Sequence, residues 1–228
     1  MRITAAARLS QTLYHKGKLG LVPRVHIEFA AKAPTAAILR RGPSDWVQLL
    51  LWDTVADTVC PGSWFHGRIP DQSCSLSPNG ELFAYKATKY QGKKTRGVNY
   101  CWTAISKLPW LTALALWPQA DTWSGAAAFA DDRTLIIDCA HWERLKTKDR
   151  LPTGFRVLPR WIGQDAPEQT LPQPTVADAQ FNGDVGADQS GREFTYKEGK
   201  LIRDNRVLVD LTIMHPDPNP PPAIASSW

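Results

Sequence analysis

The sequence predicts a single, mainly β domain: an antiparallel meander, arranged either in a propeller-like manner or as a sandwich. Short apolar stretches recur along the chain and are separated by turn residues, at the spacing typical of these β architectures. The length of 228 residues suits one large β domain. Helical spacing without a breaker is found at residues 2–14, which we expect to form a short N-terminal helix.

The expected strands follow one another within residues 1–160, which form the main β domain; residues 1–30 are its peripheral N-terminal segment. Each expected strand is a short apolar run bounded by turn residues. These runs are residues 36–41, 46–53, 64–69, 72–76, 82–90, 100–106, 114–117, 126–129, 134–139 and 155–158.

The most specific local pattern is the turn Ser77-Pro78-Asn79-Gly80, between the runs at 72–76 and 82–90. Proline presets the first backbone angle of a turn, and Asn-Gly accepts positive φ. The sequence therefore predicts a β-hairpin here.

Beyond residue 160 the composition changes. Residues 161–191 are acidic and rich in Pro, Gly and Gln, which predicts a linker. Residues 192–214 predict a β-meander with too few apolar residues for its own core, so we expect it to dock on the main domain. Residues 215–228 begin with HPDPNPPP and predict an extended tail.

Composition gives expectations about the compartment. No apolar run approaches the roughly 18 residues of a membrane helix, and the N-terminus lacks an apolar signal core. The four cysteines are widely spaced, and three lie in apolar stretches, as reduced buried thiols do. We expect a cytoplasmic protein with no membrane partner.

Two segments resemble the outer hairpin of β-propeller blades. Residues 74–85 read CSLSPNGELFAY and residues 127–136 read AAFADDRTLI, about 53 residues apart. The second segment lacks the Pro and Gly of the first, and a closed propeller needs four or more blades. The resemblance therefore implies either degenerate blades or an open, propeller-like meander.

Residues 38–118 resemble a family of uncharacterised bacterial proteins. The resemblance is carried by RRGPSDWVQL at 40–49, WFHGRI at 64–69, WTAIS at 102–106 and LTALALWP at 111–118. It covers the middle of the chain and implies a bacterial setting, without an assigned activity or site.

A basic segment, residues 86–96, is the candidate site for nucleic acid or an acidic partner. Cations attract phosphates, and a tyrosine among them can stack on bases. Two other interpretations stay open: a solvated loop that protects an edge strand, or pairing with the acidic linker. The candidate residues are Lys86, Lys89, Tyr90, Lys93, Lys94 and Arg96.

Ten tryptophans are unusual for this length, and most are expected to pack in the sheets. Trp110 and Trp123 lie near turn signals and are the candidates for a protein interface.

The sequence carries no recognisable catalytic or metal-binding pattern, so no cofactor and no metal is expected. Cys139 and His141 could share an ion, but a closed zinc site needs four ligands. Cys101, His141 and Asp121 could be written as a triad, yet Cys101 lies within an expected strand rather than beside an activating group. No phosphate loop or nucleophile elbow is present.

Three functions follow in order of preference. The first is a non-catalytic protein-interaction or regulatory module of a bacterial multi-component system, whose protein partner is unidentified. The second is an accessory nucleic-acid-binding protein that uses the basic segment. The third is an enzyme of unrecognised type.

Overall fold

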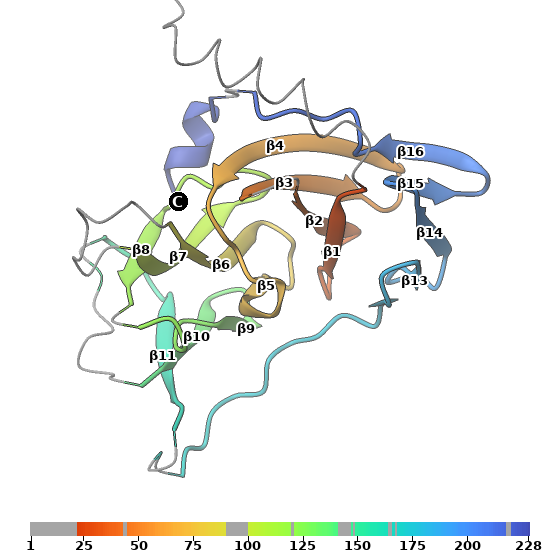
Figure 1. The fold of residues 1–228 in the computed structure, drawn as a ribbon. Helices are drawn as coiled ribbons and strands as arrows, with labels where there is room; N and C mark the ends of the chain where they lie inside the picture. The colour runs from red at the N-terminus through yellow and green to blue at the C-terminus, as the bar shows by residue number, and fades with distance from the viewer. Residues whose placement is uncertain are drawn as a thin grey trace, which may run out of the picture.

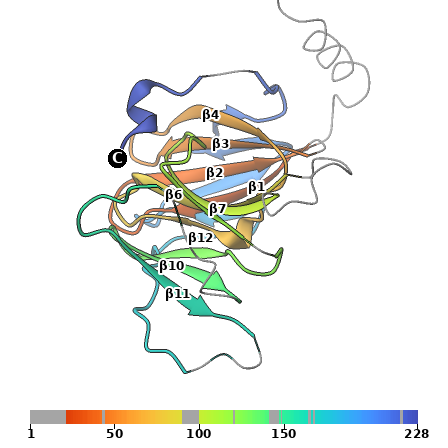
Figure 2. The same ribbon diagram turned by 90° about the vertical axis from the view of Figure 1, so that its left-hand side faces the viewer.

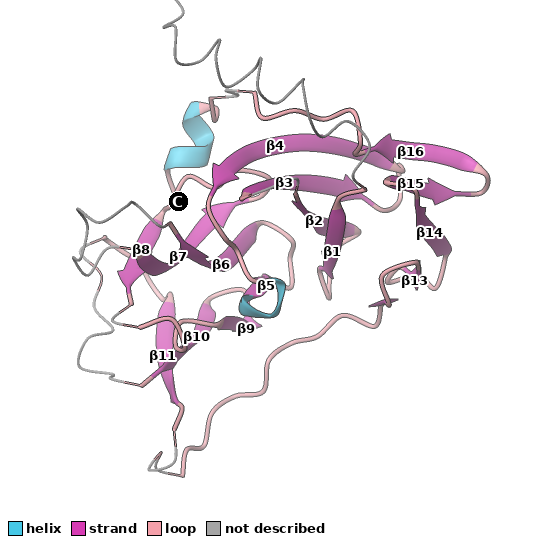
Figure 3. Cartoon of the chain, in the orientation of Figure 1, coloured by secondary structure: helices cyan, strands magenta, loops and turns pink. Residues whose placement is uncertain are grey.

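Strands dominate the computed structural model of the chain (Figure 3). It describes residues 22–42, 45–89, 100–119, 121–140, 147, 149–163, 166, 168–217 and 220–228. The described helical elements are short 3₁₀ turns, η1 (Asp71–Ser73) and η3 (Ala223–Ser226). The predicted N-terminal helix at residues 2–14 lies outside the described residues and is not supported.

Sheet A is a four-stranded antiparallel meander made of β1 (Arg24–Phe29), β2 (Thr35–Arg41), β3 (Trp46–Asp53) and β4 (Thr58–His66). The middle strands β2 and β3 are apolar on both sides, and both of their faces are buried. Such unbroken burial requires a packing partner on each face of the sheet.

Sheet B repeats this topology with β5 (Cys74–Leu76), β6 (Leu82–Thr88), β7 (Cys101–Lys107) and β8 (Ala115–Pro118). The β5–β6 connection is the hairpin that the sequence predicts. Leu76 pairs with Phe83, and Gly80 adopts a φ of 77°, which favours glycine.

Sheet C has β9 (Ala127–Asp131) and β10 (Thr134–Cys139) as an antiparallel hairpin, with β11 (Arg156–Trp161) alongside β10. The β10–β11 pair is parallel, which is the exception to the antiparallel arrangement of the described sheets.

Sheet D contains β12 (Gln180–Phe181), β13 (Val185–Ala187), β14 (Glu193–Lys197), β15 (Lys200–Arg203) and β16 (Arg206–Asp210). Strand β14 alternates exposed and buried residues, which is typical of a sheet that packs through one face.

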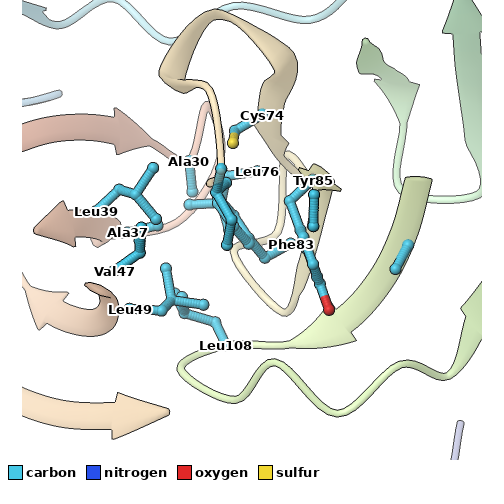
Figure 4. Close-up of a cluster of buried hydrophobic side chains, with 13 residues drawn as sticks. Ala30, Ala37, Leu39, Val47, Leu49, Cys74, Leu76, Phe83, Tyr85 and Leu108 are labelled. Atoms are coloured by element: carbon cyan, nitrogen blue, oxygen red, sulfur yellow. The ribbon is translucent and has the colours of Figure 1, made fainter. Parts of the chain in front are cut away.

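The sheets pack face to face in the order D, A, B, C (Figures 1 and 2). Each interface is a separate cluster of buried apolar side chains. Figure 4 shows the cluster between sheets A and B, where Leu39 and Leu49 meet Leu76 and Phe83. Trp52 and Phe194 belong to the D–A cluster, and Trp117 and Phe129 to the B–C cluster.

No buried cluster among the described residues joins sheet C to sheet D, and none of the sheets closes into a barrel. Between β11 and β12 the described residues form no strand, and the chain crosses from one end of the series to the other (Figure 1).

The mainly β, largely antiparallel fold class is thus confirmed, and three predicted boundaries change. Strand β1 lies in the segment predicted to be peripheral, yet Ile27 and Phe29 enter the D–A core. Strand β4 begins at Thr58, in the stretch between the expected strands at 46–53 and 64–69. Sheet D begins at Gln180 rather than at Arg192, so part of the predicted linker is strand.

The predicted tail is not simply extended. It contains η3, whose Ala225 is buried, and the Trp228 ring lies 5.3 Å from that of Phe155. No helix in the described part of the chain is long and apolar enough to cross a membrane.

Candidate functional site

The most exposed large aromatic residue of the described chain is Trp123, in the loop between β8 and β9. Its exposed fraction is 86%, whereas tryptophan usually buries most of its surface. The loop, residues 121–125, therefore presents a large apolar side chain to solvent.

The backbone of this loop is fixed by Asp121. Oδ1 of Asp121 accepts hydrogen bonds from the N–H groups of Trp123 (2.8 Å) and Ser124 (2.7 Å) and from the Ser124 hydroxyl (2.8 Å). An aspartate that accepts from the backbone two and three residues on forms a standard tight turn. Trp123 thus sits on an ordered backbone.

Lys86 of sheet B binds the backbone of the same loop. The predicted binding cation lies on β6 with an exposed fraction of 4%, and its ammonium donates to the Thr122 carbonyl at 2.5 Å. A buried ammonium needs such a partner, because desolvation is costly without one. Lys86 therefore supports the Trp123 loop and is not presented to a ligand.

The end of the loop is anchored on sheets B and C. The Thr103 hydroxyl donates to the Gly125 carbonyl at 2.7 Å, and the Gly125 N–H donates to the Asp138 carbonyl at 2.7 Å. Gly125 has a φ of 93°, and an added Cβ would lie 2.8 Å from Gln119 and Thr103. Only glycine fits this close approach.

These contacts also set the ionisation of Asp121. Burial alone would raise its pKa, but the hydrogen bonds from Ser124 and Trp123 and the nearby charge of Lys86 lower the pKa below its ordinary value. Asp121 therefore stays ionised and keeps its acceptor oxygens throughout the neutral pH range.

Trp110 has a packing role. It is half-buried and follows Pro109, whose carbonyl accepts from Ser63 on β4 at 3.1 Å. An added Cβ at Gly62 would come within 2.0 Å of that carbonyl oxygen. The Trp110 connection thus packs against sheet A, whereas the side chain of Trp123 is exposed.

Of the basic segment, only its start is described. Lys89 is half-buried, and its backbone N–H donates to the Tyr100 carbonyl at 2.8 Å. The other candidates, Tyr90, Lys93, Lys94 and Arg96, lie outside the described residues.

The described residues contain no group of three or more His, Cys, Asp and Glu side chains that could hold a metal ion. Cys101 is fully buried, and burial raises the pKa of its thiol, which is the opposite of nucleophile activation. His141, the other member of both suggested constellations, lies outside the described residues.

Comparison with known proteins gives no relative: no family model matches the chain, and no curated protein or solved structure matches it significantly.

The structure brings together Lys86 and the loop of Trp123, which the sequence places in two different candidate sites. Sequence patterns indicate Asp121 only as a member of a conceivable triad and miss its role in the turn, although Asp121-Thr122-Trp123-Ser124 carries the Asp-x-x-Ser spacing of such turns.

Proposed function

We propose that this protein is a non-catalytic protein-binding module whose anchor residue is Trp123. The observation that carries the proposal is an 86% exposed tryptophan on a loop fixed by Asp121 and Lys86. Tryptophan is among the residues that dominate binding energy at protein interfaces.

The hydrogen bonds of the loop support a binding role, because a preorganised backbone loses less conformational freedom on binding. An indole exposed this far leaves apolar area in water that a partner would cover. The proposal keeps a bacterial multi-component system as the expected setting.

The proposal is tested by site-specific photo-crosslinking in cells of the source organism. A benzophenone side chain replaces Thr122, which is exposed next to Trp123, in one variant and Val176, which is 82% exposed, in the matched control. We expect a discrete crosslinked protein at position 122 that is absent at position 176. No product at 122, or the same products at both positions, would contradict the proposal.

The captured partner then allows a direct affinity measurement. Because hot-spot tryptophans contribute about 2 kcal/mol or more, Trp123→Ala should weaken binding at least about 30-fold. Asp121→Ala keeps the indole but removes the turn, so it should weaken binding by a smaller factor. Val176→Ala should bind as the wild type does.

Nucleic-acid binding by the basic segment is the second candidate, favoured by the closely spaced cations Lys89, Lys93, Lys94 and Arg96. The discriminating measurement is a salt titration of binding to single-stranded DNA and RNA. We expect Lys93→Gln with Lys94→Gln to reduce both affinity and salt dependence relative to the control pair Lys32→Gln with Lys197→Gln. Negligible affinity at low salt would eliminate this candidate.

A further inference from the structure

A pocket of about 470 Å³ lies at the end of sheet A where β1 begins and β2 ends. Three arginines line it: Arg24 from β1, Arg41 from β2, and Arg68 from the segment after β4. Asp45 lines it as well. The volume falls in the range of about 300–1,000 Å³ that small-molecule sites occupy.

The register of sheet A places two of these cations against each other. Arg24 and Arg41 are direct partners across β1 and β2, so their side chains leave the same face of the sheet. Like charges directly opposite each other on neighbouring strands destabilise a sheet. The pocket lining thus contains an unfavourable pair of like charges.

Little within the described residues offsets this charge. Arg41 forms one ion pair, with Asp71 at 3.2 Å, in which the Asp71 side chain is 40% exposed. No carboxylate of the described residues forms an ion pair with Arg24 or Arg68. The Asp45 carboxylate lines the pocket without ion-pairing any of the three arginines.

The third arginine is held in place by sheet B. The Arg68 N–H donates to the Thr88 carbonyl at 2.9 Å, and the Thr88 N–H donates back to the Arg68 carbonyl at 2.8 Å. This bridge fixes Arg68 at the end of β6, where the chain enters residues 89–100. The pocket is therefore lined by sheet A and the segment after β4, and the backbone of its third arginine is fixed by sheet B.

We propose that this pocket binds the phosphate group of a phosphorylated ligand of about nucleotide size. Guanidinium groups bind phosphate oxygens through paired, charge-assisted hydrogen bonds, and Arg is preferred over Lys for this geometry. A bound phosphate would offset the Arg24–Arg41 repulsion. The volume leaves room for an organic group beyond the phosphate, and this proposal is independent of the role of Trp123.

Binding is measured by isothermal titration calorimetry of the full chain at low ionic strength. The probes are inorganic pyrophosphate, adenosine monophosphate and a short single-stranded oligonucleotide. We expect Arg24→Gln and Arg68→Gln each to weaken binding about tenfold or more, as loss of a charged hydrogen-bond donor does. The matched control, Arg150→Gln, removes the same charge from an exposed site outside the pocket and should bind normally.

The probes distinguish two sources of the same phosphate chemistry. Binding of the mononucleotide indicates a free small-molecule ligand. Binding of the oligonucleotide alone, with a steep salt dependence, indicates the backbone of a nucleic-acid strand. If no probe binds at low salt, or if Arg24→Gln and Arg68→Gln bind like Arg150→Gln, the proposal is overturned.

Thermal unfolding without ligand supplies a second readout. Removing one partner of a like-charge pair relieves repulsion, so Arg24→Gln should raise Tm by roughly one or two degrees in phosphate-free buffer. A lowered Tm would overturn the proposal, because the positive charge of Arg24 would then already be balanced by groups within the protein.

Discussion

A single buried arginine, Arg203 on β15, joins sheet D to sheet A. Its side chain is 1% exposed, and its guanidinium lies 2.7 Å from Asp188 and 2.6 Å from Asp57. It also donates to the Thr54 carbonyl at 3.0 Å and lies over the ring of Trp52, 4.7 Å from its centroid. Thr54 and Asp57 belong to the turn between β3 and β4, so one side chain connects two sheets.

We expect Arg203→Met to destabilise the protein by about 3–5 kcal/mol, because the buried carboxylate of Asp188 loses its buried cation and keeps only the partly exposed Arg192, at 3.4 Å. Chemical denaturation followed by circular dichroism gives the free energy of unfolding. The matched control is Arg206→Met, whose side chain is 64% exposed and 3.7 Å from Asp57. That change should cost less than about 1 kcal/mol. Equal losses of free energy in both variants would contradict the role of Arg203 in joining the two sheets.

At the scale of elements, the turns of neighbouring sheets are bonded to one another. The Lys32 N–H donates to the Pro78 carbonyl at 2.8 Å, and the Asn79 N–H donates to Oδ1 of Asp132 at 2.8 Å. Gln189 of sheet D donates to the carbonyls of Ala30, Ala33 and Thr35 at 3.0–3.1 Å. The turns of all four sheets thus form one connected end of the molecule.

The Asn79–Asp132 contact also bears on the two propeller-like segments. These residues are 53 positions apart, at the tips of the two hairpins that resemble propeller blades. The Phe129 N–H further donates to the Ser75 hydroxyl at 3.1 Å. The two segments are therefore adjacent in space, as hairpins of neighbouring blades are.

Within this contact, Gly80 should be the position where a substitution destabilises the protein most. Gly80→Ala combines a φ of 77° with a Cβ that would lie 2.8 Å from Cβ of Thr35. We expect a loss of roughly 2–4 kcal/mol in the free energy of unfolding. The control Gly183→Ala has a φ of 106° and open space around the added Cβ, so it measures the cost of the backbone conformation alone. It should lose roughly 1–2 kcal/mol of the free energy of unfolding. Similar losses in both variants would show that the contact with Thr35 is unimportant.

At the scale of the whole molecule, sheet D follows the other sheets in sequence but packs on the first of them. Phe194, Tyr196 and Leu201 of sheet D cover Phe29 and Trp52 of sheet A. Stability of this interface comes from buried apolar area and the Arg203 ion pairs rather than from the connection that precedes β12.

Cutting that connection should therefore leave the protein assembled. A protease site inserted between Pro172 and Gln173, both exposed, allows cleavage after folding. We expect the two fragments to co-elute in size-exclusion chromatography and to separate only in denaturant. Insertion of the same site between Leu50 and Leu51, within β3, is the control and should prevent folding. Fragments that separate in native buffer would contradict this account of the interface.

Local sequence patterns determined most strand positions. The run Trp46–Asp53 and the turn at Ser77–Gly80 are found as predicted, because apolar runs and turn residues act through their immediate neighbours. Strand β1 was missed because its polar residues His26 and Glu28 interrupt the apolar run, and only pairing with β2 makes it a strand.

Local sequence patterns were enough to predict the mainly β class, the order of most strands and an exposed-tryptophan candidate at Trp123. Three features depend on the folded structure: Lys86 is buried and donates to the Thr122 carbonyl, Asp188 of the predicted linker pairs with Arg203, and Arg24, Arg41 and Arg68 share one pocket. The reason is physical: burial, ion pairing and charge repulsion depend on distances between residues far apart in the chain, which periodicity and turn chemistry do not specify.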